Sequence, residues 1–79
     1  MHFKRVVVNK GVPYYVSTTT TLYRGFETMI FMCKENKPLE QLTDEDVIWS
    51  DLYVENHLNF ETAKKRHNEI CENIGEYVG

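Results

Sequence analysis

Residues 26–33 read FETMIFMC, and this short segment decides the fold because both of its faces are apolar. Side chains in a β-strand alternate between the two faces. One face of this segment carries Phe, Thr, Ile and Met, and the other carries Glu, Met, Phe and Cys. A strand with one face in water would alternate apolar and polar residues, so we predict cover on both sides. One helix covers only one face, and the second cover is either a loop or another copy of the chain.

The residues before this strand predict a β-hairpin. Two β-rich runs, residues 3–8 (FKRVVV) and 12–17 (VPYYVS), flank Asn9-Lys10-Gly11, which we interpret as a three-residue turn. Gly11 adopts positive φ at low cost. Residues 18–21 are β-branched but polar, and they either extend the second strand or form a loose connection to the third.

The residues after the central strand predict a loop, a strand and a helix. Residues 34–46 are polar, whereas residues 47–54 (VIWSDLYV) return to the composition of a strand. In the following segment Asn59 is a suitable N-cap and Gly75 a suitable C-cap for a helix. Between them His67 completes an apolar stripe at helical spacing.

Length and composition agree with one small domain. The chain has 79 residues, of which 42% are hydrophobic and 27% charged, and this balance excludes collagen-like and disordered proteins. No apolar run is long enough to predict a membrane span or the core of a secretory signal. The chain contains only two cysteines, and this low number favours a reducing compartment. We therefore predict a single α+β domain over residues 1–79, in which an antiparallel sheet of three to four strands begins with the hairpin and carries one C-terminal helix.

Several motifs resemble small uncharacterised proteins of phages and prophages of Gram-positive bacteria. The similar segments are ETMIF at 27–31, WSDLY at 49–53, ETAKKRH at 61–67 and VPYYVS at 12–17. The sequence departs from that pattern at Lys65-Arg66, where a more acidic or glycine-bearing stretch is expected. The resemblance implies a small cytoplasmic protein made inside a bacterial host. It supplies no catalytic or binding residues, because the family has no established activity.

Cys33, His57, His67 and Cys71 form the one candidate metal site. His67 and Cys71 have the i, i+4 spacing with which a helix presents two zinc ligands. No C-x-x-C pair accompanies them, and buried cysteines often act as small hydrophobic residues. A catalytic His67–Cys71 dyad would lack a group that activates the thiol and an oxyanion site. We therefore predict no metal, no cofactor and no enzymatic activity, and keep a small zinc-binding protein as the less favoured alternative.

Glu27 stands within the apolar central strand, and a buried carboxylate needs a partner. His67 on the helix stripe is the candidate partner. Such a pair could act in acid–base catalysis, but it more often fixes a helix on a sheet by a hydrogen bond. We predict the structural hydrogen bond.

Aromatic and basic residues together raise the possibility of stacking on single-stranded nucleic acid. The same tyrosines are also expected in a β-sheet without any ligand, because aromatic residues favour strands. A net charge of −3 further argues against a general nucleic-acid binder. Direct nucleic-acid binding is therefore not our prediction. The residues concerned are Tyr14, Tyr15, Tyr23, Tyr53, Arg24, Lys4 and Arg5.

Charge is distributed unevenly along the chain. Residues 1–37 have a net charge of +4, whereas residues 38–63 contain seven acidic residues and no lysine or arginine. Such a segment is either a solvated loop or a docking surface for a basic patch. We predict the second: a non-enzymatic protein-binding module acting on a host protein with a basic patch. The predicted partner-binding residues are Glu40, Asp44, Glu45, Asp46, Asp51 and Glu55.

A homodimer is also predicted, because an exposed apolar sheet of several hundred Å² is uncommon on a small monomer. The alternative function is a structural or assembly protein that works as a homo-oligomer.

Overall fold

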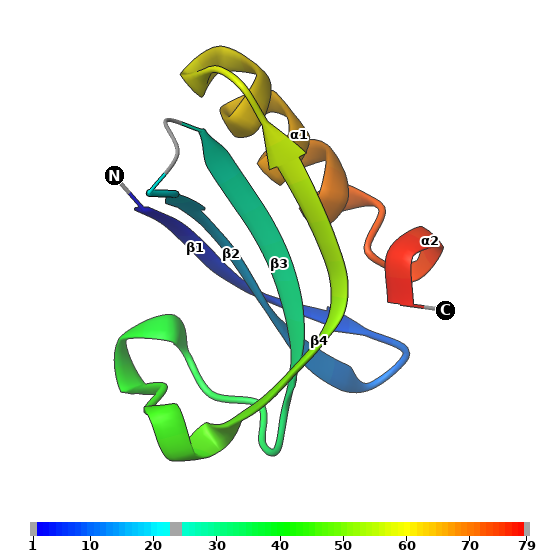
Figure 1. Cartoon of the computed structure of the whole chain (residues 1–79). Coiled ribbons are helices and arrows are strands. Elements are labelled where there is room, and N and C mark those ends of the chain that lie inside the picture. Colours follow the sequence, from blue (N-terminus) through cyan, green and yellow to red (C-terminus); the bar gives the residue numbers. More distant parts are fainter. Residues whose placement is uncertain (1, 23–24, 79) are drawn as a thin grey trace.

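The computed structural model describes residues 2–22 and 25–78. It confirms the α+β fold, with an N-terminal hairpin and a C-terminal helix packed on an antiparallel sheet (Figure 1). The four strands follow one another across the sheet in chain order: β1 (His2–Asn9), β2 (Val12–Thr20), β3 (Phe26–Cys33) and β4 (Val47–His57). The helices are α1 (Phe60–Glu72) and the short α2 (Gly75–Val78).

The hairpin turn has two residues, not the three that we predicted. Asn9 pairs with Val12, so only Lys10 and Gly11 connect β1 and β2. Both have positive φ, 51° at Lys10 and 79° at Gly11. Two such residues match the right-handed twist of the paired strands, and this is why short hairpins favour them.

The polar threonine tract extends β2 as far as Thr20, which settles the alternative that the sequence left open. In this tract Thr18 pairs with Phe3 on β1 and with Thr28 on β3. The side chain of Thr18 is only 1% exposed. β-Branched residues fit the crowded surface of a central strand, and the hydroxyl group finds partners on neighbouring elements.

The sheet has two covered faces with separate cores. On the face that carries α1, called the helix face, the core residues are Tyr14, Val16, Ile30, Ile70, Cys71 and Ile74. The opposite face is called the loop face, and its core residues are Tyr15, Phe31, Cys33 and Val47. The two faces follow the alternation of β2 and β3, as expected for a strand with large side chains on both sides.

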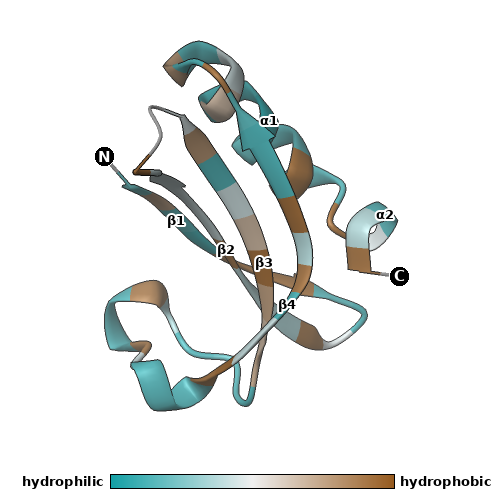
Figure 2. Cartoon of the chain, viewed as in Figure 1, coloured by the Kyte–Doolittle hydropathy of each residue, from teal (hydrophilic) through white to brown (hydrophobic). Residues whose placement is uncertain are grey.

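Residues 34–46, called the covering loop, provide the second cover. The loop contains two single-turn 3-10 helices, Leu39–Gln41 and Asp44–Asp46, and Leu42 packs against the loop-face core. The Lys34 amide donates to the Asp46 carbonyl over 2.8 Å and closes the loop at its base. Figure 2 shows that most of the covering loop consists of hydrophilic residues. Of the two covers that the sequence allows, a loop or a second copy, the loop covers part of this face.

β4 contains a bulge between Ile48 and Tyr53, so that Trp49 shares the loop face with Val47 whereas Tyr53 lies on the helix face. Ile30 pairs with Tyr53, but Met32 pairs with Ile48, so the register shifts between them. A bulge of this kind bends its strand and re-aims side chains. The Trp49 ring lies 4.9 Å from the Phe31 ring and 6.1 Å from the Tyr15 ring, measured between centroids.

The ends of α1 match one prediction and correct another. Asn59 is the N-cap, and its side-chain oxygen accepts from the Thr62 amide over 2.8 Å. The C-cap is Asn73 and not Gly75, because both the backbone and the side-chain amide of Asn73 bond to the Glu69 carbonyl. Gly75 instead begins α2.

Candidate functional site

A pocket of about 470 Å³ opens between the covering loop and the loop face of the sheet. Tyr15, Val47 and Trp49 line it from the strands, and Leu39 and Leu42 line it from the loop. The indole nitrogen of Trp49 donates to the Asp44 carbonyl over 2.9 Å, which ties the loop to β4. Trp49 is nevertheless 54% exposed, so an aromatic surface remains open to a partner.

Charged side chains of both signs surround this pocket. Glu40 and Asp44 line it from the loop, and His2 and Lys4 line it from β1. The His2 Nε2 atom lies 2.7 Å from the Ser17 hydroxyl oxygen. Partial burial, together with the charge of Lys4, lowers the pKa of His2. Polar and apolar side chains therefore line this pocket in similar measure.

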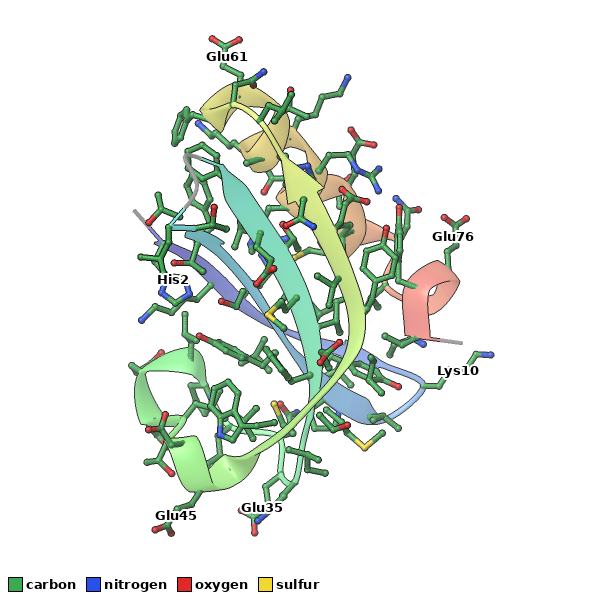
Figure 3. The ribbon with its side chains drawn as sticks, viewed as in Figure 1. His2, Lys10, Glu35, Glu45, Glu61 and Glu76 are labelled. Carbon is green, nitrogen blue, oxygen red and sulfur yellow. The ribbon has the colours of Figure 1, made fainter. Side chains whose placement is uncertain are left out.

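Four of the six predicted partner-binding acids are exposed in the structure. Glu45 lies at the outer end of the covering loop and points away from the sheet (Figure 3). The exposed acids are Glu40, Asp44 and Glu45 on the covering loop and Asp51 on β4. The first three form one group, which we call the acidic rim.

Asp46 has a structural task that the sequence analysis did not predict. Its carboxylate accepts from the Thr43 amide and hydroxyl over 2.9 and 3.0 Å, and from Lys37 over 3.0 Å. The hydrogen bond from the Thr43 amide, with that from Lys37, lowers the pKa of Asp46. The expectation that this carboxylate is free for a partner is therefore wrong, because it caps its own turn.

Glu55 is also removed from the acidic surface. Arg66 on α1 donates to both of its oxygens over 2.7 Å, and the Tyr53 hydroxyl donates over 2.6 Å. The bonds from Arg66 are the largest influence that lowers the pKa of Glu55 to about 2. Glu55 belongs to the helix face, where it holds α1 against β4.

A chain of buried polar side chains continues from Glu55 across the helix face. The Glu55 carboxylate lies 3.3 Å from Nε2 of His57, and this nitrogen lies 3.2 Å from the Thr28 hydroxyl. Thr28 and Thr18 bond over 2.6 Å, and Thr18 lies 2.8 Å from Nδ1 of His67. This polar chain joins β4, β3, β2 and α1. Four of its members are each at least 93% buried, namely His57, Thr28, Thr18 and His67.

The direction of each bond in the polar chain follows from its charged end. A carboxylate only accepts, and its position beside Nε2 of His57 favours a proton on that nitrogen, which then donates to the Thr28 hydroxyl. Thr28 then accepts from His57 and donates to Thr18, which donates to Nδ1 of His67. His67 is consequently the neutral tautomer with its proton on Nε2. Burial lowers the pKa of His67 to about 4, which agrees with this assignment.

The predicted Glu27–His67 pair is wrong. Thr28 reaches the polar chain on the helix face, so its neighbour Glu27 points to the loop face. The sheet separates Glu27 from α1, and Thr18 takes its place as the partner of His67. The sequence indicated that His67 needed a polar partner but not which strand would supply it.

The four candidate metal ligands do not converge. Cys33 lies in the loop-face core, whereas Cys71 lies in the helix-face core, so the sheet separates the two thiols. His57 and His67 share the helix face with Cys71 but are joined through two threonines. Among residues 2–22 and 25–78, no group of three or more His, Cys, Asp or Glu side chains is arranged to hold a metal ion.

The aromatic residues considered for nucleic-acid stacking are also dispersed. Tyr14 belongs to the helix-face core and Tyr15 to the loop-face core, so they cannot form one platform. Tyr53 packs against Tyr77 on the helix face at 4.9 Å between ring centroids. Tyr23 and Arg24 lie outside the described residues.

Sequence reasoning missed three contributors to these sites: Trp49 as a pocket wall, the Thr18–Thr28 connection and the Arg66–Glu55 pair. Threonines at central positions of two adjacent strands, with a histidine in a helix stripe, were the available signal for the polar chain. Alternation along β4 places Trp49 on the face of Val47, but no sequence pattern showed that a pocket forms there.

Comparisons with protein-family models, curated proteins and solved structures found no match. Within the described part of the chain, no helix has both the length and the apolarity required to cross a membrane.

Proposed function

We propose that this chain is a non-enzymatic protein-binding module that uses the acidic rim and the adjoining pocket. The observation that carries the proposal is the exposed position of Glu40, Asp44 and Glu45 beside an open aromatic pocket wall. None of these three carboxylates forms an ion pair with a described lysine, arginine or histidine. Charges that are exposed and not paired internally are available to a partner.

The partner chemistry follows from these groups. A basic patch would be attracted to the acidic rim, and an apolar or aromatic side chain would fill the pocket against Trp49. The long-range attraction would act mainly on the association rate and would weaken as salt increases. The resemblance to phage proteins adds the proposal that the partner is a cytoplasmic protein of a bacterial host.

A structural role as a homo-oligomer is the second candidate. Leu52 and Val54 on β4 remain 45% and 39% exposed. Their exposure supports some further contact for this strand. It does not distinguish a second copy from another protein, and the bulge in β4 makes regular strand pairing along its edge difficult.

Charge reversal in the acidic rim tests the proposal. Asp44→Lys with Glu45→Lys changes two exposed charges, whereas Glu72→Lys with Glu76→Lys makes the same change near the C-terminal end (Figure 3). Each protein would be used to capture partners from a bacterial host lysate at low and high salt. We expect one partner to be lost with the first variant, retained with the second and released by salt. Identical capture by both variants would show that the acidic rim only solvates the loop.

A further inference from the structure

β1 forms one outer edge of the sheet (Figure 1). The strand order is β1-β2-β3-β4, so β1 has a paired neighbour only on the side of β2. It pairs with β2 from His2 to Asn9 without a register shift, and it contains no proline. The other outer strand, β4, is interrupted by its bulge. Of the two edges, β1 is therefore the one that can accept another strand in regular register.

The hairpin turn determines which backbone groups of β1 point outward. In a two-residue hairpin the closing pair, here Asn9 and Val12, exchanges both of its backbone hydrogen bonds. Bonded pairs alternate along the ladder, so the amide and carbonyl groups of every second residue, including Val6 and Lys4, point away from β2. Among residues 2–22 and 25–78, no hydrogen bond uses these outward groups of Val6 and Lys4.

The outward groups open into a second hollow, also of about 470 Å³, which we call the β1 groove. Three consecutive residues of β1 line it, Lys4, Arg5 and Val6, as expected where a hollow lies against the edge of a strand and not against one face. The covering loop forms the opposite wall with residues 36–39. Pro38 in this wall is extended, with φ −57° and ψ 148°, but it has no amide hydrogen. The loop therefore cannot complete a regular ladder with β1 at this residue.

We propose that an extended segment of a partner protein binds in the β1 groove as an antiparallel fifth strand. Its backbone donates to and accepts from the outward groups of Lys4 and Val6 and so continues the ladder of the sheet. Antiparallel addition matches the other three strand pairs and is slightly more stable per residue than parallel addition. The site does not use the acidic rim, so the inference goes beyond the proposed function.

Lys4 sets a side-chain preference for the added strand. Its side chain is exposed on the loop face and forms no ion pair with a described residue. An acidic residue of the partner directly opposite Lys4 therefore gives a favourable cross-strand pair. A second copy of the chain lacks this match, because self-pairing centred on the groove places Arg5 opposite its own counterpart, and like charges in that position are destabilising. The occupant is consequently a strand of another protein with an acid at this position.

Synthetic peptides test strand addition on the wild-type chain. The probe is the strand-forming peptide TVTETVT, in which the glutamate and both valines share one face. With the glutamate opposite Lys4 in antiparallel register, the valine amides face β1 and the amides of the threonines beside the glutamate face away. At about 1 mM peptide, hydrogen exchange of the Lys4 and Val6 amides, followed by NMR, should slow by about tenfold or more. The Val7 amide, already bonded to β2, should not change.

Backbone methylation shows whether the peptide binds through its main chain. N-methylation of the two valines removes donors that face β1 and should abolish the protection of Lys4 and Val6. N-methylation of the two threonines beside the glutamate adds the same number of methyl groups to the other edge of the peptide, and the protection should persist.

Substitutions in the chain locate the site. Val6→Pro removes an outward amide hydrogen without removing a bond to β2, and it should weaken binding of TVTETVT by about tenfold or more. Lys4→Glu should reverse the preference, so that TVTKTVT binds more tightly than TVTETVT. Asp44→Lys with Glu45→Lys should still bind TVTETVT, which separates this site from the acidic rim.

Three results would overturn the proposal. The first is no protection of the Lys4 and Val6 amides by TVTETVT, and the second is equal protection by both methylated peptides. The third is protection in the chain without peptide that increases with protein concentration, because a second copy would then occupy the edge. The methylated peptides act on the wild-type chain, so the test stands even where Val6→Pro fails to fold.

Discussion

Thr18 and Thr28 show how single hydroxyl groups hold α1 on the sheet. Each is at least 99% buried, and each is bonded on both sides within the polar chain. Buried polar groups cost free energy unless their hydrogen bonds are made. No buried side-chain nitrogen or oxygen among the described residues lacks a partner, so the polar chain specifies one position for the helix without that cost.

Replacing Thr18 by valine keeps its shape but interrupts the polar chain. Nδ1 of His67 would lose its donor and the Thr28 hydroxyl would lose its acceptor. We expect the free energy of unfolding, measured by urea denaturation, to fall by about 1–3 kcal/mol. Thr20→Val, at an exposed position of the same strand, is the matched control and should change stability little. Equal stability of the two variants would show that the polar chain does not hold the helix.

His67 should make stability depend on pH. Its folded pKa is about 4, below the ordinary value of 6.5, so the unfolded chain binds a proton first as the pH falls. Stability is therefore complete above pH 6.5 and decreases toward pH 4, by about 3 kcal/mol in total. Urea denaturation at pH 7 and pH 5 should show the decrease, and His67→Gln should flatten it. The pKa of Glu55, lowered from 4.5 to about 2, adds a separate loss only below pH 4.5.

At the scale of elements, the covering loop is held by a small number of contacts. Leu42 packs into the loop-face core, Lys37 bonds to Asp46, and Trp49 bonds to the Asp44 carbonyl. The helix on the other face is instead anchored by a core, an N-cap and the polar chain. The loop should consequently open more readily than α1, since local stability follows buried contacts.

Trp49→Ala should release the covering loop while leaving the helix face folded. The substitution removes the ring contacts with Phe31 and Tyr15 and the hydrogen bond to the loop backbone. Limited proteolysis should cut within residues 34–46 faster than in the wild type, and amide exchange in α1 should remain slow. Leu52→Ala, which shortens another exposed β4 side chain, serves as the control. Unchanged cleavage in Trp49→Ala would mean that Leu42 and the ion pair suffice.

At the scale of the whole molecule, the sheet separates two sets of residues that look equivalent in the sequence. Cys33 and Cys71 are both buried and free, but they belong to different cores. Burial raises the pKa of both thiols, which disfavours the thiolate form that binds metals. The separation also prevents a disulfide between them without unfolding, because a disulfide requires neighbouring backbones.

Metal removal should therefore not affect folding. We expect the thermal melt to be the same with and without a strong chelator, and Cys71→Ala to lose only packing energy. Elemental analysis of the purified protein checks the same point directly. A lower melting temperature with chelator, or stoichiometric zinc, would mean that the ligands come from an arrangement other than this fold.

The strands, the hairpin and the N-cap could be predicted from the sequence because their causes are local. Alternation in residues 26–33 identified a strand with two covered faces, and Asn59 began the helix where a capping side chain was available. The exposed acids Glu40, Asp44 and Glu45 were predictable for the same reason, since a run without compensating bases is visible along the chain.

Only the tertiary structure decided which residues meet. Glu27 and Thr28 are neighbours in sequence, but the alternation of side chains along β3 places them on opposite faces of the sheet. His67 therefore has Thr18 as its partner and not the Glu27 carboxylate. Glu55 and Asp46 belong to the acidic run, yet Arg66 from α1 and Lys37 from the covering loop neutralise them. Composition sets the charge of a segment, whereas the packing of distant elements sets which charges stay free, because an ion pair depends on distance in space.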